Sequence, residues 1–274
     1  SSSNPNLQQV PARDQELAPL IRDLFLPEEG EDWVCADYAQ QEPRVLVHYA
    51  SLKNIDSALT ARDNYHQDEN TDFHQMVADM AEIPRKQAKT INLGLFYGMG
   101  QKKLALELGL DEETARSLFK KYHSKVPFVR TISNQVSNIA STRGYIKTLL
   151  GRKRRFNLWE PVDSFGEKAF PYSQAAAVYH KQKLKRAYTH KALNALIQGS
   201  AADITKAAMY QIYKAGLLND INLLLTVHDE LDFSIAPNKQ KCLNEAIQIM
   251  KSCIKLEVPL QVDVERGSTW GTIK

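Results

Sequence analysis

The chain has 274 residues, 43% of them hydrophobic, which is enough for one large domain or two small ones with an apolar core. Its formal net charge is only +3, and no apolar run approaches the ~20 residues that a membrane-spanning helix needs. The three cysteines form no C-x-x-C pair, which argues against a disulfide scaffold or a zinc site and favours a reducing compartment. The polar start, SSSNPNLQQVP, lacks a signal pattern and an initiator methionine, so we interpret it as a cut through a longer, intracellular protein.

The first half of the chain is predicted to be mainly helical. A buried strand is expected over 32–37, and the polar stretch 53–70 is expected to be a loop. Amphipathic spacing, with proline or glycine at several boundaries, predicts helices over 44–51, 72–81, 85–96, 102–108, 112–122 and 127–143.

The second half mixes strands with longer helices. The segment GYIKTLLGRKRRF predicts a small hairpin, and residues 157–172 are expected to be irregular. The remaining expected elements are a helical region over 174–214 interrupted near Gln198-Gly199, a strand hairpin over 221–235, a helix over 239–253 and a strand over 260–264. The predicted fold class is α+β, in which strands far apart in sequence form a small sheet around an inserted helical block.

Carboxylates stand at the ends of two predicted strands. Asp37 ends the first strand, and Asp229 and Glu230 lie in TVHDELDF, where a tight hairpin would usually carry glycine. Carboxylates from different strands repel each other unless a cation or a proton intervenes, and two-metal sites use such a pair in phosphoryl transfer. The alternative is a strand-end cap and an unrelated polar turn.

Two helical faces and two basic runs suggest nucleic-acid chemistry. One helical face carries a residue at every fourth position, namely Arg85, Lys89, Leu93 and Tyr97. This order suits the phosphates, sugar and base of a nucleoside triphosphate or, alternatively, an ordinary amphipathic helix with a solvated basic end.

The two basic runs suit either phosphate binding or a solvated face. They contain Lys147, Arg152, Lys153, Arg154 and Arg155, and then Lys181, Lys183, Lys185, Arg186 and Lys191. A second four-residue series, which suits minor-groove contacts or a polar stripe, contains His190, Asn194 and Gln198.

Three ordered segments, DYAQQEPR, RKQAKTINLGLFYG and VHDE, resemble motifs A, B and C of family A DNA polymerases. The resemblance continues through GYIKTLLGRKRRF, LNALIQGSAADI and VPLQVDVERGSTW, and so covers nearly the whole chain. It implies an α+β polymerase palm with a small antiparallel sheet at 1–55 and 190–274. A mainly helical fingers subdomain with a connecting hairpin is implied at 56–189, and the thumb and exonuclease-like domains lie outside this chain.

The resemblance also implies a role for individual residues. Asp37 and Asp229, with the backbone carbonyl of Tyr38, match the ligands of two Mg²⁺ ions, and Glu230 matches the acidic residue that supports them. Glu42 matches the residue that blocks a ribonucleotide 2′-hydroxyl, and Lys89 is a candidate general acid. The full set of nucleotide-binding positions is Gln40, Glu42, His74, Arg85, Lys89, Leu93 and Tyr97. The DNA-contacting positions are Arg152, His190, Asn194, Gln198 and, beside the primer terminus, His228.

Departures from the bacterial pattern indicate a phage-like subgroup. Leu93 stands where bacterial members usually have phenylalanine, His190 where they have arginine, and Pro43 where they have leucine. The expected function is template-directed DNA polymerisation with Mg²⁺, dNTPs and primer-template DNA, without a membrane. Expected protein partners are the thumb and exonuclease-like domains and other replication proteins. The alternatives are a non-catalytic primer-template-binding module and a single-subunit RNA polymerase, and Glu42 and Glu230 argue against the latter.

Overall fold

The computed structural model describes residues 10, 11, 14, 16–96, 101–163 and 166–273. The chain forms two compact units. The sheet unit comprises Ser1–Arg44, Asp68–Asn70 and Ala201–Lys274, and the helical unit comprises Val45–Gln67 and Thr71–Ser200. Helices α2 (Gln41–Ser51) and α10 (Ala192–Lys214) contribute residues to both units. The division into palm segments 1–55 and 190–274 around fingers at 56–189 stays a prediction.

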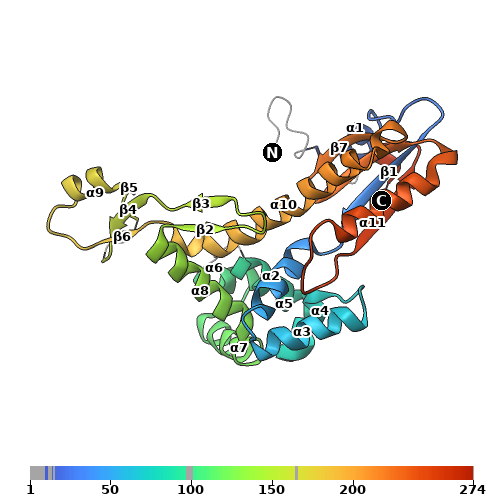
Figure 1. Ribbon diagram of the computed structural model, residues 1–274. Helices are drawn as coiled ribbons and strands as arrows, with labels where there is room; N and C mark the ends of the chain where they lie inside the picture. Colours follow the sequence, from blue (N-terminus) through green and yellow to red (C-terminus); the bar gives the residue numbers. More distant parts are fainter. Residues whose placement is uncertain (1–9, 12–13, 15, 97–100, 164–165, 274) are drawn as a thin grey trace. The chain divides into compact units, whose positions relative to one another are not determined.

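A four-stranded antiparallel sheet forms the centre of the sheet unit, in the order β7-β8-β1-β9 (Figure 1). The strands are β1 (Asp32–Tyr38), β7 (Asn222–Val227), β8 (Glu230–Ile235) and β9 (Val262–Gly267). The flanking helices are α1 (Leu17–Arg22), α11 (Gln240–Ser252) and the single turns η3 (Leu217–Asn219), η4 (Pro237–Lys239) and η5 (Trp270–Thr272). The α+β class and the small sheet of sequence-distant strands are confirmed.

The two faces of β1 differ because successive side chains point to opposite sides of a strand. One face carries the buried side chains of Val34, Ala36 and Tyr38. The Tyr38 hydroxyl donates a hydrogen bond to the carbonyl oxygen of Met250 in α11, 2.8 Å away, so α11 packs against this face. The other face carries Trp33, whose ring stacks on Trp270 at 6.0 Å, and further along the strand it carries Cys35 and Asp37.

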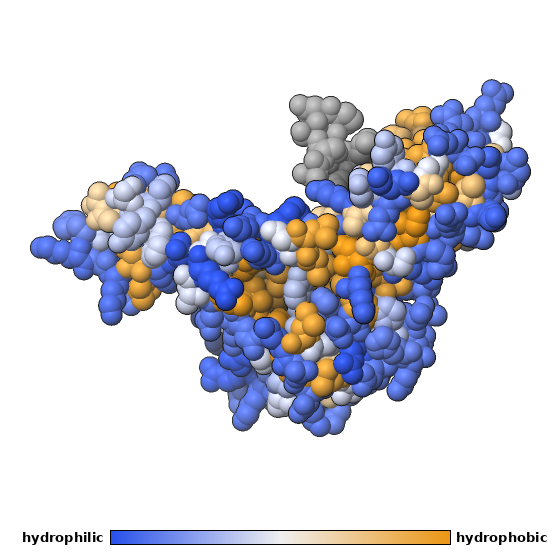
Figure 2. Space-filling model, viewed as in Figure 1, coloured by the Kyte–Doolittle hydropathy of each residue, from blue (hydrophilic) through white to orange (hydrophobic). Residues whose placement is uncertain are grey.

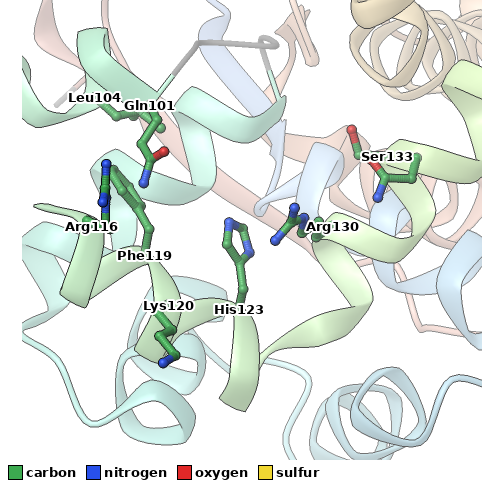
Figure 3. Close-up of a pocket in the computed structure, with 9 residues that line it drawn as sticks. Gln101, Leu104, Arg116, Phe119, Lys120, His123, Arg130 and Ser133 are labelled. Atoms are coloured by element: carbon green, nitrogen blue, oxygen red, sulfur yellow. The ribbon is translucent and has the colours of Figure 1, made fainter.

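Short antiparallel helices make up the core of the helical unit. They are α3 (Asp56–Gln67), α4 (Phe73–Ala81), α5 (Arg85–Phe96), α6 (Gln101–Leu108), α7 (Glu112–Lys125) and α8 (Pro127–Arg143). Asp72 and Asp111 begin α4 and α7 as N-caps, since each carboxylate accepts hydrogen bonds from two backbone N–H groups of the first turn. Helices α6, α7 and α8 line a hollow of about 510 Å³ (Figure 3).

Strands follow α8 in two small groups. The predicted hairpin is confirmed as β2 (Tyr145–Lys147) and β3 (Lys153–Arg155). A three-stranded sheet with the order β5-β4-β6 comes next. It consists of β4 (Leu158–Pro161), β5 (Phe170–Pro171) and β6 (Leu184–Arg186), and it is accompanied by α9 (Tyr172–Val178) and the turn η2 (Thr189–Lys191). Most residues on this end of the helical unit, at the far left of Figure 2, are hydrophilic.

Three predicted elements are wrong. The expected loop at 53–70 contains α3, whose inward face consists of two alanines and a tyrosine and so shows little hydrophobicity. The expected irregular segment 157–172 and the start of the expected long helix form β4, β5, α9 and β6, because β4 pairs with a strand more than twenty residues away. Helix α10 runs without a break through Gln198 and Gly199.

Gly199 and Gly94 both serve close packing between neighbouring elements. A Cβ atom at Gly199 would lie 2.6 Å from Cγ2 of Thr148, in the β2–β3 turn. A Cβ atom at Gly94 in α5 would lie 2.1 Å from Cδ2 of Leu104 in α6, which confirms the expectation that something approaches this backbone closely. None of the helices in the described part of the chain is long and apolar enough to cross a membrane.

Candidate active site and nucleotide-binding face

A row of carboxylates crosses the sheet. Asp37 in β1 lies opposite Glu230 in β8 and opposite Asp263 in β9. Residues opposite each other in an antiparallel sheet project from the same face, so these three side chains are neighbours. The register therefore brings together Asp37 and Glu230, as predicted, and adds Asp263, which sequence reasoning missed.

Asp229 completes this group from the hairpin turn. The turn between β7 and β8 consists of His228 and Asp229, and His228 has a positive φ of 57°. Histidine adopts this left-handed conformation more readily than most side chains, which explains how the turn forms without glycine. The backbone N–H of Tyr38 donates a hydrogen bond to the Asp229 carbonyl oxygen at 3.3 Å, and this contact ties the turn to the end of β1.

The carboxylates raise one another's pKa values. Burial, and then the nearby Asp229, Glu230 and Asp263, raise the pKa of Asp37 to about 7. Burial also raises the pKa of Asp229. Oε1 of Glu230 is buried and accepts no hydrogen bond from any residue that the structure describes. Such crowded oxygen donors fit a hard divalent cation such as Mg²⁺, which prefers carboxylate and carbonyl ligands.

A second acidic row lies two residues further along the strands. It contains Cys35, Asp232 and Glu265, in register across β1, β8 and β9. Asp232 is fully buried, and within the described part of the chain neither of its carboxylate oxygens has a hydrogen bond of ordinary geometry. Burial and the neighbouring Glu230 raise the pKa of Asp232. The i, i+2 spacing from Asp37 and Glu230 is the sequence signal that could have identified this row.

A cavity of about 200 Å³ in the sheet unit opens onto both acidic rows. Arg22 also lines it, with its guanidinium over the Trp270 ring at 4.4 Å. Two predicted nucleotide-binding residues, Gln40 and Glu42, belong to the same unit and directly follow β1. Gln40 has a φ of 52°, and Glu42 lies in the first turn of α2.

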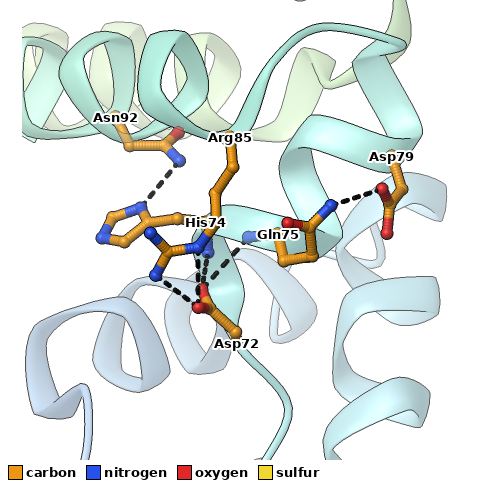
Figure 4. A network of polar contacts seen from close by, with 6 residues as sticks. All are labelled: Asp72, His74, Gln75, Asp79, Arg85 and Asn92. Atoms are coloured by element: carbon orange, nitrogen blue, oxygen red, sulfur yellow. Dashed lines mark hydrogen bonds and ion pairs between the residues drawn. The ribbon is translucent and has the colours of Figure 1, made fainter.

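The remaining described nucleotide-binding candidates lie on α4 and α5 in the helical unit (Figure 4). Nε of Arg85 donates to Oδ2 of Asp72 at 3.0 Å, while Oδ1 of Asp72 caps α4. Partial burial would raise the pKa of Asp72, but the hydrogen bonds from Arg85 and the backbone outweigh it and lower the pKa. Because this ion pair is partly exposed, it contributes only ~0–1 kcal/mol, and a phosphate can compete for Arg85.

A buried polar chain fixes His74 beside Arg85. Nδ1 of His74 is 3.2 Å from Nδ2 of Asn92, and the Asn92 carboxamide oxygen accepts a hydrogen bond from the Tyr122 hydroxyl. Burial lowers the pKa of His74, and the nearby Lys89 and Arg85 add to this effect. Sequence reasoning missed Asn92 and Tyr122, which hold the imidazole in place. Lys89 is exposed.

The last two predicted nucleotide-binding residues are Leu93 and Tyr97. Leu93 is half-buried on α5. Tyr97 lies outside the described residues.

The predicted DNA-contacting residues fall in both units. His190, Asn194 and Gln198 belong to the helical unit, and His228 belongs to the sheet unit. His190 and Gln198 are exposed, and Asn194 is half-buried. Arg152 donates a hydrogen bond to the Gly199 carbonyl oxygen at 2.6 Å, so it also fastens the β2–β3 hairpin to α10.

Basic residues are concentrated on the strands of the helical unit. Residues 145–191 contain eleven Lys and Arg and three Asp and Glu, which gives them a net charge of +8. One of these basic side chains, Arg186, is engaged within the protein. It lies over the Trp159 ring at 4.6 Å and donates hydrogen bonds to the carbonyl oxygens of Ser141 and Phe156. The exposed side chains of Lys181 and Lys183 remain available to a polyanion.

Comparison with known proteins identifies the class. The sequence model of DNA polymerase family A matches residues 1–272, and the chain therefore belongs to this family. It is 41% identical to a DNA-directed DNA polymerase of Pseudomonas phage M6, over 99% of this chain and 43% of that protein. It is 35% identical to DNA polymerase I of Synechocystis, over 98% of this chain and 27% of that protein.

A solved structure supports the same assignment. It is described as the POL domain of Pol1 from M. smegmatis in complex with DNA primer-template and dNTP. The two share 32% sequence identity with a TM-score of 0.79, over 100% of this chain and 46% of that one. The chain spans less than half the length of these relatives.

Proposed function

We propose that this chain carries the polymerising site of a template-directed DNA polymerase. The primer 3′-oxygen attacks the α-phosphorus of a dNTP, a new P–O bond forms, and the bond to pyrophosphate breaks. The observation that carries the proposal is the row Glu230–Asp37–Asp263 with Asp229 beside it, in a chain of this family.

Two Mg²⁺ ions would be held at the end of β1 and in the adjoining turn. Asp37, Asp229 and the Tyr38 carbonyl would be their ligands, and Glu230 would support the arrangement. When bound, such ions lower the pKa of the attacking hydroxyl and neutralise charge on the phosphates. The raised pKa of Asp37 supports this assignment, because crowded carboxylates are stabilised by a cation.

The helical unit supplies the groups that bind the triphosphate. Arg85 and His74 hold phosphate oxygens, Lys89 donates a proton to the leaving pyrophosphate, and Leu93 and Tyr97 face the sugar and base. Gln40 and Glu42 contact the nucleotide from the sheet unit, and Glu42 excludes a 2′-hydroxyl. The firm placement of His74 by Asn92 and Tyr122 supports its role, since a pre-positioned donor loses little entropy on binding.

The DNA and the protein partners follow from the same assignment. Asn194 and Gln198 contact the minor groove, His190 and Arg152 contact the primer-template backbone, and His228 lies at the primer end. The protein works inside the cell, with thumb and exonuclease-like domains of a longer chain and with other replication proteins.

Primer extension with Mg²⁺ and dNTPs tests the proposal. Asp37→Ala should abolish extension, while Asp32→Asn, at the start of the same strand and paired with Arg266, should extend normally. The assay should compare this chain with one extended at its N-terminus, because the relatives are longer. Extension by Asp37→Ala at the wild-type rate would refute the site. Binding of primer-template without any extension by either chain would favour a non-catalytic module, and a preference for rNTPs would favour an RNA polymerase.

A further inference from the structure

The hollow between α6, α7 and α8 belongs to none of the sites above. It lies within the helical unit, has a volume of about 510 Å³ and falls in the size range of small-molecule sites, roughly 300–1,000 Å³. Its described lining residues are Gln101, Leu104, Arg116, Phe119, Lys120, His123, Arg130, Ser133 and Asn134. Figure 3 shows the side chains of Gln101 and His123 pointing into the hollow between Arg116 and Arg130.

Three cations surround this hollow without a neutralising carboxylate. Arg116 and Lys120 lie one turn apart on α7, and Arg130 comes from α8. No Asp or Glu occurs among the described residues that line the hollow, and none of the three cations has an ion pair within the described part of the chain. Like charges gathered around a concave surface attract anions strongly.

A histidine and an apolar wall complete the lining. Nδ1 of His123 is buried and has no hydrogen-bond partner among the described residues. Burial, and then the charge of Arg130, lower the pKa of His123, as expected for an imidazole among cations. Phe119 and Leu104 are almost fully buried and form the apolar part of the wall, beside the amides of Gln101 and Asn134 and the hydroxyl of Ser133.

We propose that this hollow binds a nucleoside phosphate. Arg116, Lys120 and Arg130 bind the phosphate oxygens, and the sugar or base packs against Phe119 and Leu104. Two sources share this chemistry, namely a free nucleotide and one unit of an unpaired DNA strand. The inference concerns binding alone and does not depend on the proposed polymerase activity.

Nuclear magnetic resonance of the His123 ring in the full chain provides a test specific to this hollow. Inorganic phosphate, dTMP and a short oligothymidylate serve as separate probes. We expect ligand addition to shift the His123 resonances and to raise the pKa of the ring, because an anion favours the imidazolium. The double variant Arg116→Gln/Arg130→Gln should need at least about tenfold more ligand for the same shift, since it loses two charge-assisted contacts.

The matched control is Lys214→Gln/Lys241→Gln, which removes the same charge from exposed positions of the sheet unit. It should titrate like the wild type. Saturation by dTMP would identify a free-nucleotide site, and a response to the oligothymidylate alone would identify an unpaired-strand site.

His123 resonances that no probe moves, or a double variant that titrates like the control, would overturn the inference. A chain that responds at His123 but fails to extend a primer would instead count against the proposed function.

Discussion

Replacing Asp37 with asparagine should stabilise the metal-free protein while abolishing its activity. Burial and three neighbouring carboxylates raise the pKa of Asp37 from 3.8 to about 7. The folded protein therefore holds this proton more tightly than the unfolded chain does. The free energy of unfolding falls as pH rises through the window between the two pKa values. At ~1.36 kcal/mol per pKa unit, ionisation of Asp37 above pH 7 lowers the free energy of unfolding by about 4 kcal/mol.

Asparagine removes this cost because it carries no charge. Asp37→Asn should therefore gain about 4 kcal/mol in free energy of unfolding at pH 8 but only about 1.5 kcal/mol at pH 5, where Asp37 is still largely protonated in the folded state. Urea unfolding in EDTA at both pH values measures the difference. An equal gain at both pH values, or no gain at pH 8, would refute the reasoning.

Three further substitutions test contacts within one unit. Arg44→Lys should lose about 3–5 kcal/mol of stability in urea, because the buried guanidinium donates to the carbonyl oxygens of Ala39, Pro259 and Glu69, and an ammonium cannot reach all three. The half-buried Arg62→Lys, as its control, should change little, because Arg62 pairs with the neighbouring Asp63 near the surface. Asp72→Asn keeps an N-cap side chain but releases Arg85, so the KM for dNTP should fall up to about fivefold in primer extension. An increase in KM would contradict a role of Arg85 in phosphate binding. Tyr122→Phe should lower the free energy of unfolding by about 1–2 kcal/mol in thermal melts, since it leaves the buried Asn92 oxygen without its donor. An unchanged melting temperature would show that this bond contributes nothing.

Local sequence patterns predicted much of this fold because many elements carry their own signals. Helix α4 has an aspartate cap, α8 begins at Pro127, and β1 is a short apolar run. Helix α3 escaped detection because its buried face consists mainly of alanines, and β4 escaped because its partner β6 is distant in sequence. Both depend on contacts that only the tertiary structure provides.

Some residues of the candidate site are also identified by local motifs, while others are identified only by the pairing of strands. Asp37 and Asp229 stand in recognisable motifs, so the sequence alone identified them as candidates. Asp263 is next to Asp37 only through the pairing of β1 with β9, which no motif specifies. The i, i+2 spacing from Glu230 places Asp232 on the same face of β8, but its complete burial beside Cys35 follows from the pairing of β8 with β1.

The contact at Gly94 has a mechanical consequence. The Leu104 side chain of α6 occupies the space where a Cβ atom of Gly94 in α5 would be. Any larger residue at this position would therefore force the two helices apart. Leu104 also lines the hollow between α6, α7 and α8, so this contact joins the helix that carries Arg85 and Lys89 to the wall of that hollow.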